Sequence, residues 1–384
     1  MGLIGPIALP FSMILPRLIA LCLLIGTADF SWSKSAQKAT NRDLEVASRF
    51  APIFYQALGD KPRSDYITNF DFDGDWQGDN NWNNAANKDF PLKAYIYFSV
   101  CETATHFFIH YAVYHPRDYK GGERRGALLS ELIRQGAKRG GKYDPTGLAD
   151  EAALAHENDM EGALVAVEKS GNDLTEAHVA FVETLHHNNF SHYRPGDPQE
   201  GVSPIKLEAG RPLLYVEPKG HGIESFDGQE KQTANKTFLR YVYTGRADNP
   251  DQGDFVCSDL EKTPCNKSVG YQLVPLASLW AKVAAEPNKT YGVVFDYGDI
   301  KLMTSLTNGE PKERSFRVGT IGCAFLGKVG GVNMARPPWG WFDRDERDQK
   351  LGLWFFDPAT VIKKDFKLDE KFSVVYIRLP FWAK

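Results

Sequence analysis

The alternation of apolar and polar residues along the chain predicts strands more often than long helices. Two neighbouring stretches, KAYIYFSV at 93–100 and THFFIHYAVYH at 105–115, alternate with a period of two and are rich in aromatic and β-branched residues, which is typical of strands. Similar runs occur at 162–167, 177–185, 212–216, 237–243, 291–296, 317–326 and 372–379. Because no βαβ alternation accompanies them, the pattern favours a mainly β fold, a β-sandwich with long loops and a few peripheral helices.

Helical spacing occurs in two places. Residues 43–58 carry Leu44, Ala47 and Phe50 at intervals of three, and Asp43 precedes them as a good N-cap residue. Pro52 predicts a break in this stretch, which allows its second half to be extended. The basic segment 121–141 has a short apolar stripe at helical spacing and predicts an inserted helix or flap.

The N-terminus has the order of a targeting segment. An apolar run at 18–25 follows Arg17 and precedes small residues at 26–28, which predicts a cleaved signal peptide over 1–28, with an uncleaved membrane anchor as the alternative. We expect a flexible stretch at 29–42, then a single β-sandwich domain with insertions at 43–384, or a separate C-terminal extension at 245–384. The expected location is secreted or periplasmic, and no transmembrane span is expected in the mature protein.

Composition excludes several classes of function. Hydrophobic residues make up 42% and charged residues 24% of the chain, as in ordinary soluble proteins. The net charge of −4, without a long Lys/Arg block, gives no reason to expect a nucleic-acid partner. The chain also lacks the nucleophile elbow, the HExxH zinc motif, the phosphate-binding Walker loop and the dinucleotide fingerprint.

Four cysteines remain once Cys22 is removed with the signal peptide, and they allow three pairings. Cys257 and Cys265 flank the short polar loop CSDLEKTPC, so a local disulfide between them is the preferred interpretation. Cys101 and Cys323 lie in apolar stretches, where buried thiols are the competing explanation.

The hexapeptide HENDME at 156–161 concentrates metal-binding residue types. Asp159 and Glu161 are two residues apart and can share a strand face, and His156, in the preceding turn, can fold back over them. Two carboxylates and one imidazole suit Ca²⁺, Mg²⁺, Mn²⁺ or Zn²⁺. A solvated turn that only caps the strand is the alternative.

Three stretches carry a family resemblance. The H-x-x-D-x-E order of 156–161, followed by a small residue and an apolar run, resembles the HDWEG segment of the necrosis-and-ethylene-inducing-like secreted proteins. It is also similar to the H-x-x-D-W-E segment of the vacuolar protein sorting-associated 62 family. PLLYVEPKGHGIESF at 212–226 resembles a strand and turn found in both groups, and RFAPIFYQ at 49–56 resembles the opening of the sorting-associated family.

The resemblance implies a single-domain β-sandwich with a divalent cation, Ca²⁺ or Mg²⁺, in a cavity at one end. It implies that the histidine, aspartate and glutamate singled out in HENDME are ligands. A further aspartate lies eight residues before the histidine in the necrosis-inducing group, where this chain has Leu148, so Asp150 or Asp144 would take that place. Met160 stands where those families carry tryptophan, so cytolytic activity on plant membranes is not carried over.

Two further stretches supply candidate ligand-binding residues. His221 lies between two glycines, where backbone can approach a ligand closely, and Glu224 follows three residues later. The loop DFDGDW offers Asp73 and Asp75 as cation ligands, although Trp76 stands where a calcium-binding EF-hand needs glycine. A loop built from Asx turns is the alternative for these two aspartates.

Other histidines and tryptophans favour structural roles. His186 and His187 are adjacent and would face opposite sides of an extended strand, so they are not expected to serve one metal ion together. His106 and His110 share a strand face and are expected to be buried and hydrogen-bonded. The tryptophans of RPPWGWFD at 336–343 are expected to cap the core, with an exposed sugar-binding pair as the alternative.

These observations predict an exported protein whose divalent cation helps it to recognise a glycan or a lipid headgroup. The alternative is a metal-dependent hydrolase that acts on an ester or phosphodiester, with Glu157 or His221 as its base. The absence of a recognised nucleophile and base pair favours the non-enzymatic interpretation.

Overall fold

The computed structural model describes residues 40–119, 155–171, 173–228, 237–258, 264–284, 291–306, 309–327, 335–343 and 350–380. The predicted signal peptide, the basic segment 121–141 and the candidate ligands Asp144 and Asp150 lie outside these ranges. No helix within the described part of the chain is both long and apolar enough to cross a membrane.

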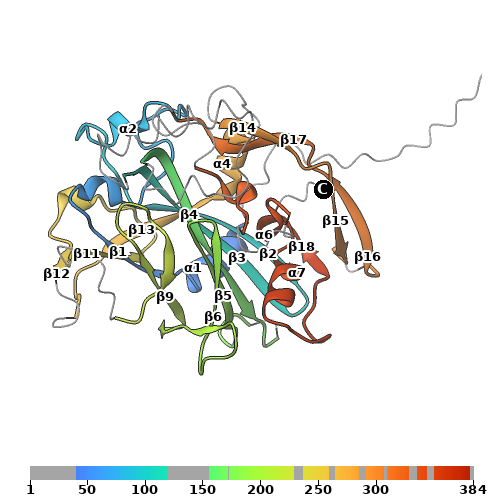
Figure 1. Ribbon diagram of the computed structural model, residues 1–384. Helices are drawn as coiled ribbons and strands as arrows, with labels where there is room; N and C mark the ends of the chain where they lie inside the picture. Colours follow the sequence, from blue (N-terminus) through green and yellow to red (C-terminus); the bar gives the residue numbers. More distant parts are fainter. Residues whose placement is uncertain are drawn as a thin grey trace, which may run out of the picture.

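One large curled sheet forms most of the described structure, which is mainly β as the sequence predicts (Figure 1). Its strands follow one another in the order β10, β9, β1, β11, β13, β2, β3, β4, β5, β6 and β7. Their bounds are Ile223–Ser225 (β10), Arg211–Val216 (β9), Ile53–Ala57 (β1), Thr237–Tyr243 (β11), Val269–Pro275 (β13), Tyr95–Thr103 (β2), His106–Asp118 (β3), His156–Glu168 (β4), His178–His186 (β5), Asn189–Arg194 (β6) and Ser203–Pro204 (β7).

Further strands and several helices complete the structure. The remaining strands of the large sheet are Leu207–Glu208 (β8), Val256–Ser258 (β12), Asp299–Thr304 (β15), Lys312–Arg317 (β16) and Tyr376–Arg378 (β18). Tyr291–Asp296 (β14) and Thr320–Phe325 (β17) pair separately. The α-helices are Asn41–Arg49 (α1), Asn81–Asn84 (α2), Leu276–Val283 (α4), Leu353–Phe356 (α6) and Pro358–Asp365 (α7), and the 3-10 helices are Pro62–Asp65 (η1), Pro250–Gln252 (η2) and Pro338–Gly340 (η4).

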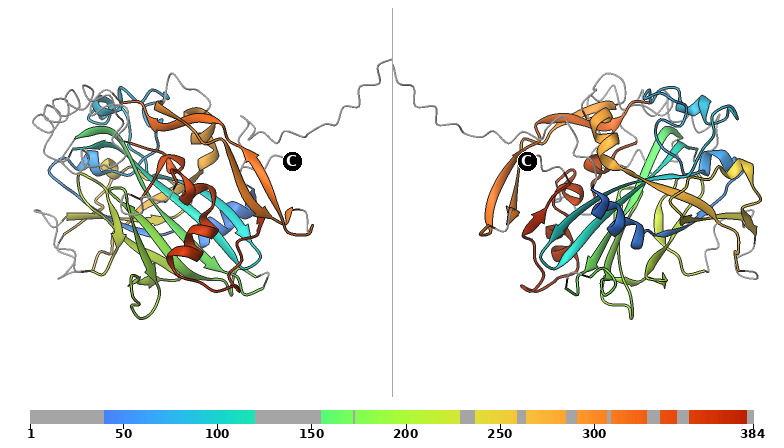
Figure 2. Two further views of the ribbon diagram at one scale, coloured as in Figure 1. Left: turned by 45° about the vertical axis from the view of Figure 1, so that its right-hand side comes forward. Right: turned by 180° about the vertical axis from the view of Figure 1, so that it is seen from behind.

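The sheet curls until its distant strands meet. Although β9 and β10 lie many strands away from β4 and β5 in the sheet order, β10 contacts both β4 and β5, and β9 contacts β5. Twist accumulates from strand to strand and gives a wide sheet this shape. Figure 2 shows the curl from two further sides, with α1 and α4 against β2.

The central strand β3 is covered on both faces. The Tyr111 hydroxyl donates to the Ala47 carbonyl of α1 at 2.7 Å, and His110 Nε2 lies 3.0 Å from the Trp354 carbonyl of α6. Neighbouring residues of a strand point to opposite faces, so a helix lies against each face. All thirteen residues of β3 are buried as a result.

The C-terminal part of the chain supplies the largest side chains of the core. Trp339, Trp341 and Trp354 are at most 1% exposed, so the prediction that the tryptophans of 336–343 cap the core is confirmed. Trp341 Nε1 donates to the Met160 carbonyl of β4 at 3.1 Å. A Cβ atom on Gly162 would collide with the Trp341 ring and approach the Tyr111 carbonyl oxygen to 2.6 Å. The small residue after HENDME is therefore required by packing.

The sequence predicts most strands near their observed positions but places the first helix cap wrongly. Thr40 is the N-cap of α1, and Asp43 is the N3 partner of a capping box, so the prediction of Asp43 as N-cap is wrong. Pro52 ends the helical region, and β1 follows as the extended second half that the sequence allows. The disulfide Cys257–Cys265 is present, as expected, and Cys101 and Cys323 are buried thiols, the alternative that the sequence left open.

Candidate functional site

The hexapeptide HENDME is part of a strand and not of the turn before it. β4 begins at His156, six residues earlier than the apolar pattern predicts, and pairs with β3 so that Asp118 lies opposite His156 and His115 opposite Asp159. All six residues are buried. The prediction that His156 folds back from a turn is therefore wrong, because pairing with β3 extends the strand through polar residues that local propensity does not mark.

Asn158 holds this polar stretch to its surroundings. Its backbone adopts φ +58°, which is uncommon for a residue other than glycine. Its side-chain nitrogen donates to the carbonyls of Gly78 and Leu326, both at 2.7 Å, and its oxygen accepts from Asn81 and Tyr114 at 2.8 and 2.6 Å. A fully hydrogen-bonded, buried amide rigidifies the start of β4.

His156 presents its Nε2 atom to a carboxylate. Its Nδ1 lies 2.9 Å from the Asn158 carbonyl oxygen, which can only accept, so Nδ1 carries a proton. Nε2 lies 3.5 Å from Asp118 Oδ2. Nε2 therefore faces a carboxylate oxygen, an arrangement in which a shared cation would be stabilising. Asp118 is thus a candidate ligand that the sequence pattern did not single out.

His221 lies between two buried carboxylates. Its Nδ1 is 2.8 Å from Asp159 Oδ2 and its Nε2 is 3.3 Å from Asp65 Oδ1, and all three side chains are at most 9% exposed. Burial alone would lower the pKa of His221, but the hydrogen bonds and charges of Asp159 and Asp65 raise it to about 9. Both ring nitrogens donate, so His221 is the internal cation that balances these two acids. The backbone of His221 has φ +56°, and strained backbone of this kind clusters at functional sites.

A second histidine stacks on this imidazolium. The rings of His115 and His221 lie 3.8 Å apart and within 7° of parallel. Burial first, and the charge of His221 second, hold the pKa of His115 well below its usual range. His115 Nε2 lies 2.8 Å from the side-chain oxygen of Gln56, which requires a proton on Nε2. The neutral ring of His115 therefore stacks on the charged ring of His221 and holds its plane.

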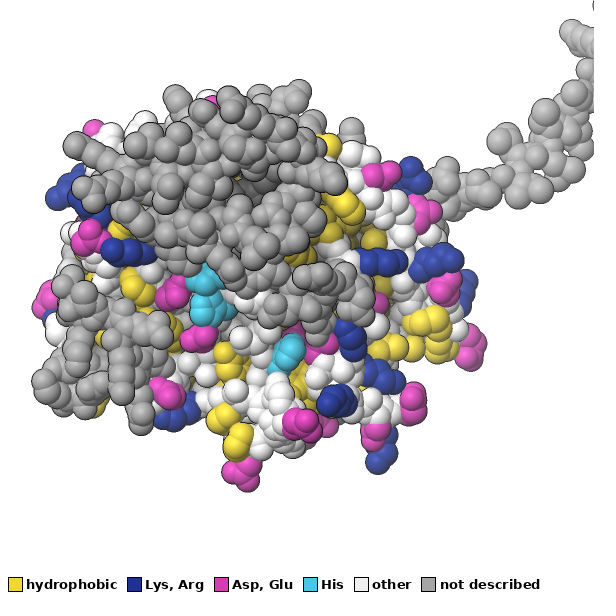
Figure 3. All heavy atoms as spheres, viewed as in Figure 1, with side chains coloured by type: hydrophobic (Ala, Val, Ile, Leu, Met, Phe, Trp, Pro, Cys, Tyr) yellow, Lys and Arg dark blue, Asp and Glu magenta, His cyan; other side chains and the backbone are white. Residues whose placement is uncertain are grey.

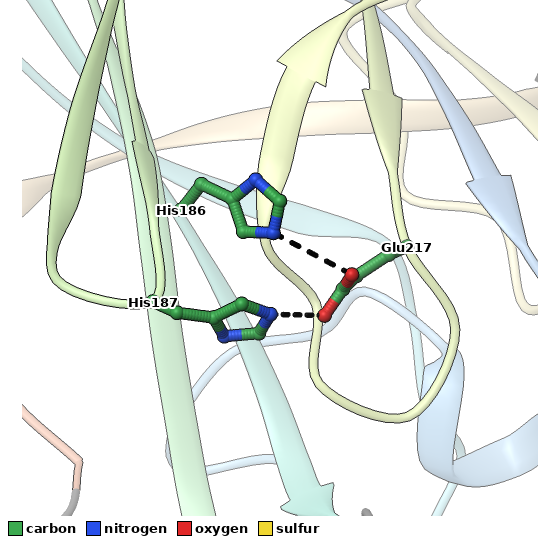
Figure 4. A group of neighbouring side chains, drawn as sticks. All are labelled: His186, His187 and Glu217. Carbon is green, nitrogen blue, oxygen red and sulfur yellow. Dashed lines mark ion pairs between the residues drawn. The ribbon is translucent and has the colours of Figure 1, made fainter. Parts of the chain in front are cut away.

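Adjacent His186 and His187 converge on one carboxylate (Figure 4). β5 ends at His186, and His187 and Asn188 form a two-residue hairpin loop with φ +51° and +62°, the signature of a type I′ turn. The turn swings His187 to the same side as His186, so the expectation that they cannot face one ion is wrong. His186 Nε2 lies 3.5 Å from Glu217 Oε2, and His187 Nε2 pairs with Glu217 Oε1.

Glu224 and Glu161 connect this turn to its neighbours. Glu224 Oε1 accepts from His186 Nδ1 at 2.8 Å, and this hydrogen bond lowers the pKa of Glu224. The backbone N–H of His187 donates to Glu161 Oε1 at 3.4 Å. The acids of β4 and the histidines of the β5–β6 turn therefore lie side by side. Histidine and acidic side chains gather in the middle of the face shown in Figure 3.

The predicted calcium-type loop uses its aspartates for turns. Asp73 Oδ1 and Asp75 Oδ1 accept from the backbone N–H groups two residues ahead, at 3.2 and 2.7 Å. Their other oxygens accept from Asn84 and Asn80 at 2.6 and 3.0 Å. This is the Asx-turn geometry that the sequence allowed as the alternative, and a ligand-binding role for the two aspartates stays a prediction.

The two bases considered for a hydrolase are both engaged. Glu157 Oε1 accepts from the backbone N–H of Trp82 at 2.6 Å, and Glu157 is 1% exposed. His221 donates from both ring nitrogens and has no lone pair to accept a proton. In this geometry both residues are held by partners within the protein.

The histidines of β3 match their expected structural role. His110 is 2% exposed and bonded at both nitrogens, to Ser99 and to the Trp354 carbonyl. His106 is 5% exposed and its Nδ1 lies 2.8 Å from the Thr105 hydroxyl. Burial lowers the pKa of each histidine to about 4, so both are neutral at physiological pH.

The donor atoms at the start of β4 fit a hard divalent cation in kind, since they are carboxylate oxygens with one imidazole nitrogen. Among the described residues, groups of metal-ligand atoms that lie within 4.8 Å of one another occur at His186, His187 and Glu217, and at Glu183, His192 and Asp365. His156, Asp159 and Glu161 are not drawn together to that degree, and Asp150 lies outside the described residues. Their role as ligands stays a prediction.

Solved structures similar to this chain include necrosis-and-ethylene-inducing-like proteins, but the likeness is weak. The non-toxic HaNLP3 protein shares 13% identity over 63% of this chain and 78% of its own, with a TM-score of 0.28. Necrosis and ethylene inducing protein 2 from the causal agent of cocoa's witches' broom disease shares 12% identity over 53% and 76%, with a TM-score of 0.27. NLPPya in complex with mannosamine shares 12% identity over 50% and 70%, with a TM-score of 0.26.

No protein-family model and no curated protein matches the chain. The resemblance to necrosis-inducing proteins is therefore matched by solved structures at low identity and over part of the chain. The resemblance to the vacuolar sorting-associated family finds no support in these comparisons and stays a prediction. An overlap this small carries no conclusion about function, so function is argued from the site.

Proposed function

We propose that this is an exported β-sandwich protein that binds a divalent cation, Ca²⁺ or Mg²⁺, at the start of β4. The β4 site comprises His156, Asp159 and Glu161, with Asp118 as a further ligand. The bound ion recognises a glycan or a lipid headgroup, because Ca²⁺ and Mg²⁺ sites accept oxygen ligands from outside the protein. The acidic protein has no general attraction for anionic membranes, so a bridging cation is the more direct contact.

The observation that carries this proposal is the facing pair of His156 Nε2 and Asp118 Oδ2 among buried acids. Asp118, Asp159 and Glu161 are 5–7% exposed and lie at one end of the same strand pair. Buried carboxylates are costly unless cations balance them. His221 pairs with Asp159 and Asp65, and the carboxylate oxygens gathered here are donor atoms that a divalent ion accepts.

Export is supported by the chain's covalent chemistry. The Cys257–Cys265 disulfide is of a kind that persists in oxidising compartments outside the cytosol. The predicted signal peptide points the same way, and N-terminal sequencing of the secreted protein would test it.

The first experiment measures ion binding. Mature wild-type protein is titrated calorimetrically with Ca²⁺ and Mg²⁺, and its melting temperature is recorded with each ion and with chelator. At a hundredfold excess over Kd, the ion should stabilise the fold by about 2.7 kcal/mol. Asp159→Asn should weaken ion binding at least tenfold and reduce the ion-dependent part of the melting shift.

The ion-dependent shift is the readout because Asp159→Asn also weakens the contact with His221. Glu168→Gln is the matched control, since Glu168 lies at the other end of β4 with a side chain 51% exposed. It should bind the ion like wild type. Equal binding by wild type and Asp159→Asn would return HENDME to a purely structural role.

The second experiment tests what the ion is used for. The protein is screened against glycan and lipid arrays with Ca²⁺, Mg²⁺ or chelator, and mannosamine, the sugar named for NLPPya, is included. We expect chelator-sensitive binding and no turnover of ester or phosphodiester substrates. Metal-dependent turnover that is lost in Asp159→Asn, without chelator-sensitive binding, would establish the hydrolase alternative instead.

A further inference from the structure

We propose that His186, His187 and Glu217 form a second metal site, for Zn²⁺, on the β5–β6 turn. This turn site adjoins the proposed β4 site through the contact of His187 with Glu161, but its ligands are different residues. It uses two residues that the sequence pattern assigns to structural roles and one that it does not single out.

The three side chains lie close enough together to share one zinc ion. One ligand atom from each residue lies within 4.8 Å of the other two. Ligand atoms of a tetrahedral zinc ion are about 3.3–3.5 Å apart when the bonds are about 2.0–2.1 Å long. His186 Nε2 and Glu217 Oε2 are 3.5 Å apart, so small side-chain rotations would suffice to enclose an ion.

A carboxylate behind His186 orients it for metal binding. Glu224 Oε1 lies 2.8 Å from His186 Nδ1, which keeps a proton on Nδ1 and turns Nε2 toward Glu217, where Zn²⁺ would take the place of the proton shared with that carboxylate. Histidine ligands of zinc characteristically donate their other N–H to such a carboxylate, which holds the ring and raises its basicity. Glu224 is therefore a positioning residue for the turn site.

The backbone around the turn site is shaped to hold the His186 ring. A Cβ atom on Gly222 would collide with the His186 ring carbon and approach its Nε2 to 2.8 Å, so only glycine lets the ring lie there. Glu217 directly follows β9 and Glu224 lies in β10. The curl of the sheet brings these late strands against β5 and delivers ligands from two distant parts of the chain.

The donor set selects the class of ion. Two imidazole nitrogens and one carboxylate suit Zn²⁺ and its neighbours among the transition metals, whereas Ca²⁺ and Mg²⁺ prefer donor sets in which oxygen predominates, as it does at the β4 site. The side chains of His186, His187 and Glu217 are 26%, 28% and 16% exposed. Three protein ligands with this exposure leave a coordination position for water or for an oxygen atom of a bound ligand.

The test uses the mature protein stripped of metal, titrated with Zn²⁺ by calorimetry and with Co²⁺ by visible absorption. Wild type should bind Zn²⁺ and give the intense Co²⁺ bands of a tetrahedral site. His186→Gln and His187→Asn should each weaken Zn²⁺ binding at least a hundredfold and abolish these bands. Glu224→Gln should weaken binding about 10–100-fold, the usual effect of losing such an outer partner.

Asparagine is chosen at position 187 because it tolerates the left-handed backbone that the turn requires. Unfolding of each variant without metal is compared with wild type, and Glu217→Gln replaces any variant that fails to fold. His178→Gln is the matched control, since His178 is in the same strand and pairs with Glu168 at the surface. It should bind Zn²⁺ like wild type.

The outcome separates the turn site from the β4 site. Asp159→Asn should leave Zn²⁺ binding within about threefold of wild type. Zn²⁺ binding lost in Asp159→Asn but retained in His187→Asn would place the zinc at the β4 site and overturn the assignment. The assignment would also be overturned if wild type did not bind Zn²⁺, or if both histidine variants bound Zn²⁺ as tightly as wild type does.

Discussion

Histidines in this protein take opposite charge states according to their immediate neighbours. His110 and His115 lie in the same strand without carboxylate partners in their described contacts, and burial lowers the pKa of both. His221 is equally buried, but Asp65 and Asp159 raise its pKa to about 9. At the scale of single residues, the hydrogen-bond partner decides whether a buried imidazole carries charge, and sequence position alone does not.

This difference predicts how stability depends on pH through His110. Because the pKa of His110 is about 4 in the folded protein and about 6.5 when unfolded, the unfolded chain binds the additional proton between these values. Stability is therefore retained above about pH 6.5 and lost as the pH falls toward 4, by up to about 3 kcal/mol. His110→Gln can keep both hydrogen bonds without titrating, so denaturant unfolding from pH 7 to 4.5 should show a shallower loss. Equal slopes for the two proteins would contradict the prediction.

A second residue-scale prediction concerns Gly162, which lies against the Trp341 ring. Gly162→Ala should lower the free energy of unfolding by about 1–3 kcal/mol, the usual cost of overpacking a close-packed core. Gly309→Ala is the control, because the nearest atom to its Cβ would be 3.7 Å away, and it should change stability by less than about 0.5 kcal/mol. Urea denaturation measures both. A neutral Gly162→Ala would mean that the Trp341 ring can move aside.

At the scale of elements, the sequence predicts strands where apolar alternation is regular and fails where tertiary contacts decide. Five of the first six residues of β4 are polar, and only the pairing with β3 and the buried network around Asn158 extend the strand to His156. The β5–β6 turn carries neither glycine nor an Asn-Gly pair, so its type I′ geometry and the convergence of His186 and His187 were hidden. Asp118 could be recognised as a site residue only from the pairing of β3 with β4, and Glu217 only from the curl of the sheet that brings β9 against β5.

The disulfide gives an element-scale prediction for the edge strand β12. Cys257 in β12 and Cys265 enclose a loop of about nine residues, for which loop-closure entropy predicts about 2–3 kcal/mol of stabilisation. Replacing both cysteines by alanine should lower the free energy of unfolding by about this amount. A reducing agent should destabilise wild type similarly and leave the double variant unchanged. A reductant effect on the double variant would show that another bond or thiol is responsible.

At the scale of the whole molecule, the last third of the chain contributes strands to the main sheet and side chains to its core. β13 lies between β11 and β2 and is parallel to both, and the tryptophans at 339, 341 and 354 fill the core. The curl then places β9 and β10 against β4 and β5. The β4 site and the turn site thus depend on strands that meet only when the whole sheet is assembled.

This arrangement predicts that residues 29–244 do not fold without the rest of the chain. Removing β13 would leave unpaired N–H and C=O groups along both β11 and β2, and edges of that kind invite aggregation. The truncated chain should lack a cooperative thermal transition in circular dichroism, whereas 29–384, prepared identically, should unfold cooperatively. Mixing the fragments 29–244 and 245–384 is a complementary test. Pairing of β13 with β11 and β2 should restore part of the cooperative thermal transition. A soluble 29–244 with its own cooperative transition would instead show that 245–384 is a separate C-terminal extension.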